Sequence, residues 1–296
     1  MLQQAAAAAA GAQQYPAGAL YVVATPIGNL ADMTLRAMHV LTLVDAVACE
    51  DTRVTGGLLR HLGLDKPLLA LHEHNESRAA AAVVERLGEG QRIAYVSDAG
   101  TPAISDPGAA LVGAVRAAGR RVIPIPGPSS AVAAVSVAGD ALADGFRFAG
   151  FLPSKAGERR AALEALGPGT AVLFEAPHRI AALGQALADQ WPERTVTLCR
   201  ELTKQFEAVH TMAAAALPAW LAEDPNRARG EFVVVLHAAV AAAPRPDELP
   251  PEAERALTVL MEGGLPLKQA VSLAAALTGA ARNRLYARAL EQRPTP

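Results

Sequence analysis

Short apolar runs alternate with amphipathic stretches along most of the chain. Runs at residues 19–24, 46–49, 67–71, 93–96 and 121–124 have the length of buried strands, and helical patterns follow them. Strand, turn and helix in repetition are typical of βαβ units and a helix-covered parallel sheet. The alternation returns with runs at 146–150, 171–174, 195–199 and 232–236. The pattern therefore predicts an α/β fold, and 296 residues suffice for two domains.

Each of the first five predicted strands ends in a polar or Gly/Pro-rich turn. The turns are TPIGNL (25–30), EDTR (50–53), HEHNE (72–76), SDAGTPAISDPG (97–108) and PGPSS (126–130). Parallel strands present their carboxyl ends at one edge of a sheet, where ligands of such folds bind. Five polar turns at one edge therefore predict a binding face. Gly100 suits the close approach of a ligand to the backbone.

Phosphate-binding motifs are missing from these turns. The first turn has neither the G-x-G-x-x-G of a dinucleotide site nor the G-x-x-x-x-G-K-[ST] of a P-loop. NAD, FAD and ATP are therefore disfavoured as ligands.

Two turns carry charged clusters with more than one interpretation. The Glu50–Arg53 segment either orients a polar substrate or caps the following helix with acidic residues in its first turn. His72 and His74 would share one face of a strand, but no third and fourth ligand stands out nearby, so we expect no metal site.

Composition narrows the class of protein. The chain is 51% hydrophobic and 4% aromatic, which suits a parallel sheet covered by helices, and its net charge of −2 gives no global sign of a nucleic-acid or membrane partner. Cys49 and Cys199 fit neither a disulfide framework nor a zinc site, so a reducing cytoplasm is favoured. No apolar run reaches membrane-spanning length.

The two ends and the second half add local features. Residues 1–18 read as a low-complexity leader, disordered or weakly helical, and not as a signal peptide. Basic clusters follow three later strands and are either a solvated face or a phosphate-facing surface. Residues 239–251 read as a linker, and helices are predicted at 252–262, 266–278 and 281–292. This basic tail suits either nucleic-acid contact or packing on a partner subunit.

Six motifs in order then identify a family. TPIGNLADMTLRA (25–37), ACEDTR (48–53), SDAGTPAISDPG (97–108), PGPSSAVAA (126–134), FLPSK (151–155) and FEAPHR (174–179) together resemble the small-subunit ribosomal RNA cytidine 2′-O-methyltransferases, a branch of the tetrapyrrole methylase superfamily. The resemblance runs from about Leu20 to His237, and the segment 265–290 is also similar to that branch.

The resemblance implies two α/β domains with S-adenosylmethionine between them, and a homodimer. With the leader, linker and tail it gives domains at 1–18, 19–143, 144–238, 239–251 and 252–296. Matching positions imply these cofactor-binding residues: Pro26, Gly28, Gly100, Thr101, Pro102, Ile104, Ser129, Ser130 and Ala131, with Phe174 and Glu231 as further contributors. The first turn, TPIGN, lacks the glycine-rich loop of corrin and porphyrin methylases, which disfavours a tetrapyrrole substrate.

The implied reaction is methyl transfer to a ribose hydroxyl of 16S ribosomal RNA in the small subunit. A hydroxyl is a poor nucleophile, and a positioned base typically adds about 10²–10⁴-fold to the rate. We expect Asp51 to be that base, with Arg53 and Lys155 holding adjacent phosphates. The alternatives are a small-molecule methylase of the same fold and a non-catalytic RNA-binding protein that senses the cofactor.

Overall fold

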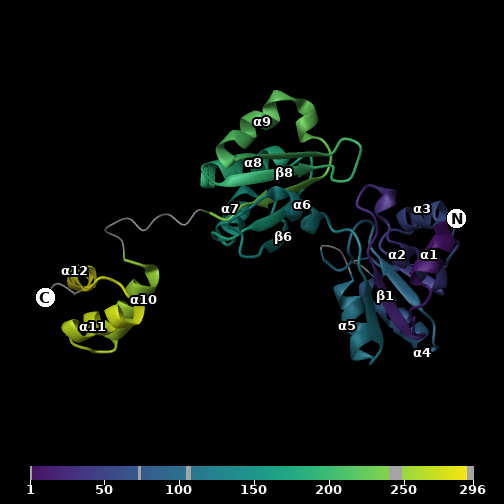
Figure 1. Cartoon of the computed structure of the whole chain (residues 1–296), viewed down its shortest axis with the longest axis horizontal. Coiled ribbons are helices and arrows are strands. Elements are labelled where there is room, and N and C mark those ends of the chain that lie inside the picture. The colour runs from purple at the N-terminus through teal and green to yellow at the C-terminus, as the bar shows by residue number, and fades with distance from the viewer. Residues whose placement is uncertain (1, 73–74, 105–107, 240–248, 292–296) are drawn as a thin grey trace. The chain divides into compact units, whose positions relative to one another are not determined.

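The computed structural model describes every residue except 1, 73–74, 105–107, 240–248 and 292–296. The chain divides into two compact units, Met1–Ala238 and Ala239–Pro296. The first unit holds two five-stranded sheets with helices packed against them, and the second is helical in its described part (Figure 1). The α/β fold predicted from the sequence is confirmed.

The first sheet is parallel throughout, with strand order β3-β2-β4-β1-β5. Its strands are β1 Ala19–Val23, β2 Ala46–Cys49, β3 Leu68–Ala70, β4 Ile93–Val96 and β5 Arg121–Ile125. Every residue of β2 and β4 is buried, because helices cover both faces of the sheet. The connecting helices are η1 Leu30–Asp32, α2 Leu35–Leu43, α3 Thr52–His61, α4 Glu76–Gly88 and α5 Ala109–Ala117. All five carboxyl ends therefore share one edge.

The second sheet is mixed, with strand order β6-β7-β10-β8-β9. Its strands are β6 Arg147–Phe151, β7 Ala171–Glu175, β8 Thr195–Arg200, β9 Ala208–Ala213 and β10 Phe232–Leu236. Only the β6–β7 pair is parallel among the described pairs, so the all-parallel arrangement that the composition suggested holds for the first sheet alone. Strand β9 was not predicted, because most of its residues are exposed and its apolar signal is weak.

Helices of the second sheet pack mainly through small and aliphatic residues. They are α6 Ser130–Ala138, α7 Ala156–Glu164, α8 Ile180–Gln190, η2 Ala214–Ala216, α9 Leu217–Glu223 and η3 Pro225–Ala228. The small residues of α6 allow close packing: Ala131, Ala134 and Ala138 are buried in a cluster with Val233 and Val235 of β10. A helix that follows the first sheet in the chain thus packs on the second.

Of the two expectations for the leader, the helical one is observed and the disordered one is wrong, because the segment is folded onto the first sheet's helices. Helix α1 (Leu2–Ala10) buries Ala6 and Ala10 and packs against α2. The Gln3 side chain donates to the carbonyls of Leu62 and Gly63, which follow α3. Six consecutive alanines favour a helix and present a flat, small face for packing. Low complexity hid this role in the sequence.

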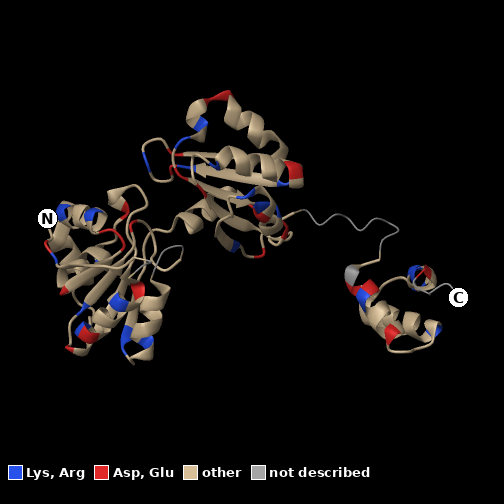
Figure 2. Cartoon of the chain, turned by 180° about the vertical axis from the view of Figure 1, so that it is seen from behind, with Lys and Arg blue, Asp and Glu red and all other residues tan. Residues whose placement is uncertain are grey.

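The second unit is formed by α10 (Pro251–Glu262), α11 (Leu267–Thr278) and α12 (Arg282–Glu291), close to the predicted helices. They enclose a small apolar core that includes Leu257, Val271 and Leu285. Both basic and acidic residues occur in this unit (Figure 2). Most of the predicted linker, residues 240–248, lies outside the described residues. Among the described helices, none has the length and hydropathy needed to span a membrane.

Candidate functional site

A cavity of about 610 Å³ lies within the first unit, at the edge where the strands of the first sheet end. From that sheet it is lined by Ile27, Glu50, Ser97, Asp98, Ala99, Gly100, Thr101 and Ile104. The start of α6 adds Ser129, Ser130 and Ala131. The second sheet and its loops add Phe151, Phe174, Glu175, Ala176, Pro177, Cys199, Leu202, Glu231, Phe232 and Val233. Volumes of this size are typical of small-molecule and cofactor sites.

The turn after β4 is tied to the turns after β1 and β5. The backbone N–H of Thr25 donates to the Gly100 carbonyl at 2.9 Å, and the Gly100 N–H donates to the Thr25 carbonyl at 3.0 Å. The Thr101 hydroxyl donates to the carbonyl of Pro128 at 3.0 Å. Gly100 has φ +80°, a conformation that costs other residues about 1–2 kcal/mol. Three separate turns therefore form one rigid wall of the cavity.

The first turn of α6 supplies the polar backbone of another wall. Ser129 is the N-cap with extended backbone, and Ser129, Ser130 and Ala131 all line the cavity. The N–H groups of a helix's first turn have no partner within the helix and carry the positive end of its dipole. This wall suits a carboxylate or a hydroxyl on a bound molecule.

The charged residues that line the cavity in the described structure are all acidic: Glu50, Asp98, Glu175 and Glu231. Asp98 also accepts the backbone N–H of Asp51 at 3.1 Å. The Glu175 side chain is buried and pairs with Arg179 at 3.0 Å, so Glu175 helps to hold the strand end in place. An acidic cavity favours a cationic ligand and disfavours a phosphate.

Phenylalanines of the second sheet give the cavity an apolar side. The ring centroid of Phe174 lies 5.0 Å from that of Phe148 and 5.7 Å from that of Phe151, and both ring pairs are edge-to-face. Cys199 lines the same cavity, and burial raises the pKa of its thiol to about 11. The thiol therefore stays protonated at neutral pH and is a poor nucleophile.

Most of the residues that the resemblance implied for the cofactor line this cavity. They are Gly100, Thr101, Ile104, Ser129, Ser130, Ala131, Phe174 and Glu231. Pro26, Gly28 and Pro102 belong to the same turns but are not among the described lining residues. Gly28 instead lies under the side chain of Lys204, where an added Cβ would be 2.5 Å from Cγ of that lysine.

The three residues expected to be catalytic lie outside the cavity lining. Asp51 caps α3 by accepting the Arg53 N–H at 2.7 Å, and its carboxylate also pairs with the Arg53 guanidinium. These hydrogen bonds from Arg53 lower the pKa of Asp51 to about 2. Lys155 pairs with Glu158 at 3.0 Å on an exposed surface. Of the two interpretations of the EDTR segment, the helix cap is observed for Asp51, while its neighbour Glu50 reaches the cavity.

Sequence reasoning named Glu50 only as part of the Glu50–Arg53 segment and did not name Asp98 and Glu175 as individual site residues. Each lies at the last residue of a strand or within two residues after it, which is a signal that the sequence carried. Glu231 differs, because it comes directly before β10. Since β10 is antiparallel to β7 and β8, its amino end lies beside their carboxyl ends. The direction of that strand therefore brings Glu231 to the site.

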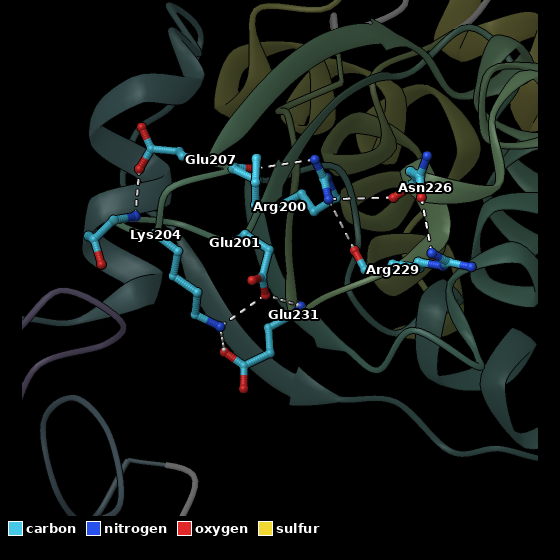
Figure 3. Close-up of polar contacts among 9 residues, drawn as sticks. Arg200, Glu201, Lys204, Glu207, Asn226, Arg229 and Glu231 are labelled. Atoms are coloured by element: carbon cyan, nitrogen blue, oxygen red, sulfur yellow. Dashed lines mark hydrogen bonds and ion pairs between the residues drawn. The ribbon is translucent and has the colours of Figure 1, made fainter.

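A network of polar contacts holds Glu231 at the cavity (Figure 3). The Lys204 ammonium donates to Glu201 and to Glu231, each at 2.9 Å. The N–H of Glu231 donates to the Glu201 carboxylate at 2.8 Å. Burial opposes the charge on Glu201, but this N–H and Lys204 outweigh it, so the pKa of Glu201 lies below its ordinary value. The same carboxylates outweigh burial at Lys204 and raise its pKa.

Comparison with known proteins identifies the fold and the family. A model of the Tetrapyrrole (Corrin/Porphyrin) Methylases matches residues 19–218, and one of the RsmI C-terminal HTH domain matches 247–293. The Escherichia coli O157:H7 protein named Ribosomal RNA small subunit methyltransferase I is 48% identical over 278 residues, 93% of this chain and 96% of that protein. The chain belongs to the ribosomal RNA small subunit methyltransferase I branch of the tetrapyrrole methylase family.

Other members and more distant structures agree with this family. The protein of the same name from Vibrio cholerae serotype O1 is 46% identical, over 92% of this chain and 94% of that protein. The uroporphyrin-III-C-methyltransferase of Thermus thermophilus is 25% identical with a TM-score of 0.51, covering 74% of this chain and 94% of that one. Cobalt precorrin-4 methyltransferase, at 18% identity and a TM-score of 0.53, covers 75% and 98% and shares the fold.

Proposed function

We propose that this protein transfers a methyl group from S-adenosylmethionine to the ribose 2′-hydroxyl of a cytidine in 16S ribosomal RNA of the small subunit. The observation that carries the proposal is the 48% identity to a protein named Ribosomal RNA small subunit methyltransferase I, which the match covers over 96% of that protein's length. The match of the second unit to the RsmI C-terminal HTH domain supports an RNA substrate, since that module is separate from the methylase match.

The cavity has the chemistry that S-adenosylmethionine requires. This cofactor carries a sulfonium and an ammonium, which suit acidic walls, and a carboxylate, which suits the start of α6. Its lack of pyrophosphate agrees with the absence of a phosphate loop. The residues proposed to hold it are Gly100, Thr101, Ile104, Ser129, Ser130, Ala131 and Phe174, with Pro26, Gly28 and Pro102 shaping the turns, while Glu231 lies where the cavity meets solvent. When bound, it supplies a methyl group activated by its positive sulfur.

The chain's own residues contribute the alignment of the two reactants. Holding the two reactants in line accounts for about 7–11 kcal/mol of a barrier at best. The hydrogen bonds between Thr25 and Gly100, and between Thr101 and Pro128, keep the cavity wall rigid for this purpose. The aromatic rings of Phe174 and Phe151 give the cavity an apolar side against which the cofactor would pack.

Asp51 as general base, with Arg53 and Lys155 on neighbouring phosphates, stays a prediction. In its favour, Asp51 donates its N–H to Asp98, a residue that lines the cavity. Against it, a pKa of about 2 makes Asp51 a weak proton acceptor at neutral pH. Arg53 has an exposed side chain next to this turn and would reach a phosphate.

The proposed setting is the cytoplasm, which contains the ribosomal subunits and is reducing. Two free cysteines agree with a reducing compartment. A homodimer is part of the proposal, because exposed apolar side chains gather in and after α6 and would be covered by a second copy. They are Val132, Val137, Leu142 and Phe146. The proposal also keeps the division of the chain into segments 1–18, 19–143, 144–238, 239–251 and 252–296.

Transfer of labelled methyl from S-adenosylmethionine to small subunits from cells lacking this activity tests the function. The expected result is one methyl group per 16S ribosomal RNA, mapped by nuclease digestion to the 2′-oxygen of a cytidine. Label on a base would overturn the 2′-hydroxyl assignment. No label on RNA, together with methylation of a tetrapyrrole, would establish the small-molecule alternative. Binding of S-adenosylhomocysteine without transfer to either would favour a cofactor-sensing RNA-binding protein.

A further inference from the structure

The turn between β8 and β9, residues 201–207, has an unusual backbone. Glu201 and Thr203 adopt positive φ values of +52° and +66°. Such conformations are strained in residues other than glycine, and they persist where the surrounding contacts enforce them. Here the Thr203 N–H donates to the Glu207 carboxylate at 2.6 Å, and the Glu201 N–H donates to the Glu231 carbonyl at 2.9 Å. Strain of this kind clusters at functional sites.

This turn reaches from the second sheet to the first turn of the first sheet. The Lys204 side chain passes over Gly28, where an added Cβ would lie 2.5 Å from its Cγ and 3.0 Å from its Cε. Ile27, next to Gly28 in the first turn, and Leu202, in the same turn as Lys204, both line the cavity. Lys204 therefore crosses the rim of the cavity with its ammonium fixed between two carboxylates.

Glu231 is the accessible carboxylate of this group. It lines the cavity, yet its side chain is 80% exposed, so it lies where the cavity meets solvent. One carboxylate oxygen, Oε2, accepts from Lys204 at 2.9 Å, and no described residue occupies Oε1. Glu201, in contrast, is partly buried and accepts from both Lys204 and the N–H of Glu231. A macromolecular substrate can reach the rim while the methyl donor fills the interior.

We propose that Glu231 is the catalytic base of methyl transfer, and that Lys204 and Glu201 are positioning residues that hold its carboxylate at the rim. This inference rests on the proposed function, because it requires a hydroxyl nucleophile. Asp51 differs from Glu231 in two respects: its carboxylate is bonded to Arg53 through both oxygens, and it does not line the described cavity. Glu231 has an oxygen open to the substrate.

In the proposed step the RNA hydroxyl is the nucleophile. The hydroxyl oxygen forms a bond to the methyl carbon while the carbon–sulfur bond breaks, and the electron pair of that bond stays on sulfur. The hydroxyl proton passes to Oε1 of Glu231 and from there to water. Lys204 keeps its proton throughout, because the two carboxylates raise its pKa.

Glu231→Gln tests the role of the base, since the amide has the same shape but accepts a proton poorly. We expect kcat for methyl transfer to small subunits to fall about 100-fold or more. Affinity for S-adenosylhomocysteine, measured by calorimetry, should stay within about threefold of wild type, because the loss belongs to the transition state. Glu207→Gln is the matched control: it makes the same change in the same network, but Glu207 is not among the described lining residues.

Lys204→Met tests the positioning role, because it keeps most of the stem over Gly28 and removes the charge. Charged groups near Glu231 are Lys204 and Glu201 in the turn, Glu175 at the end of the neighbouring strand β7, and Glu50 and Asp98 across the cavity. With the cation gone, these acids raise the proton affinity of Glu231, so the acidic limb of the kcat–pH profile should move to higher pH. Lys204→Met/Glu231→Gln should lose no more activity than Glu231→Gln alone, since both act through one carboxylate.

The possible results distinguish failure of the proposed function from failure of the assigned base. A wild-type protein without methyl transfer to RNA would overturn the proposed function itself. Active wild type with an equally active Glu231→Gln variant would overturn the assignment of the base alone, and inactivity of Asp51→Asn would then return that role to Asp51. Weaker binding of S-adenosylhomocysteine in Glu231→Gln, with kcat retained, would make Glu231 a cofactor contact instead. Additive losses in the double variant would remove Lys204 from the mechanism.

Discussion

Gly100 illustrates how a single missing side chain shapes the cavity. Its φ of +80° lets it exchange two backbone hydrogen bonds with Thr25, and an added Cβ would come within 3.4 Å of Cγ2 of Ile27. Both Gly100 and Ile27 line the cavity. A side chain at this position would strain the turn and would contact the cavity wall at Ile27.

Gly100→Ala should therefore weaken binding of S-adenosylhomocysteine about tenfold, as calorimetry would measure, and lower the free energy of unfolding by about 1–2 kcal/mol. Gly119→Ala is the control, because Gly119 has a similar φ of +69° but nothing within 4 Å of its added Cβ. The control should lose similar stability and keep its affinity. Equal affinities of Gly100→Ala and wild type would show that this turn does not contact the cofactor.

Among elements, the ends of α6 and β10 are joined by a buried polar cluster. Asp140 follows α6 and accepts from the Thr170 hydroxyl at 2.6 Å and from the Ala238 N–H at 2.8 Å. His237 follows β10, and its Nε2 shares a hydrogen bond of 2.7 Å with the Thr197 hydroxyl. These contacts attach the segment after α6, which connects the two sheets, to the residues that follow β10 at the end of the first unit.

This cluster predicts a pH dependence of stability. Burial lowers the pKa of His237, and Arg194 adds to this, while Asp140 opposes it. The unfolded chain therefore takes up a proton near pH 6.5 that the folded chain resists, so stability is complete above this pH and declines as pH falls through the folded pKa. The free energy of unfolding, measured by urea denaturation between pH 7.5 and 5, should fall more steeply with decreasing pH in wild type than in His237→Gln. Equal slopes would mean that this histidine is not the titrating group.

Helix α1 shows the limit of sequence reasoning at the scale of elements. Its alanines carry no amphipathic signal, since every face of such a helix looks the same in the sequence. Contact with α2 and the hydrogen bonds of Gln3 decide which face is buried. Strands β2 and β4, in contrast, were predicted with their observed bounds, because buried strands are continuous apolar runs between polar turns.

At the scale of the whole molecule, the chain combines a cavity-bearing unit with a separate helical unit. The charged groups of the second unit divide into two kinds. Arg288 pairs with Glu254 at 2.8 Å and with Glu291 at 2.9 Å, so it supports the fold of that unit. Lys268 and Arg284 take part in none of the side-chain ion pairs found among the described residues and are suited to phosphate contact.

Lys268→Glu/Arg284→Glu should weaken binding to small subunits and lower the slope of log K against log salt by roughly 1–2, because two phosphate contacts are lost. Filter binding from 50 to 200 mM salt would measure both effects. Arg288→Gln is the comparison variant. It should lower the melting temperature of the second unit and leave the salt slope close to that of wild type, because Arg288 forms ion pairs within this unit. A slope unaltered by the double reversal would assign this unit to protein contacts.

Amino-acid order by itself determined the alternation of strands and helices, the polar turns, the lack of a phosphate loop and the six motifs that indicate the family. These properties are local, because hydrophobic period and turn chemistry act over a few residues. Only the tertiary structure decided that β10 runs antiparallel and brings Glu231 to the rim, that Glu50 rather than Asp51 reaches the cavity, and that Lys204 crosses over Gly28. Strand direction and side-chain partners depend on contacts between residues far apart in the chain, which no local pattern encodes.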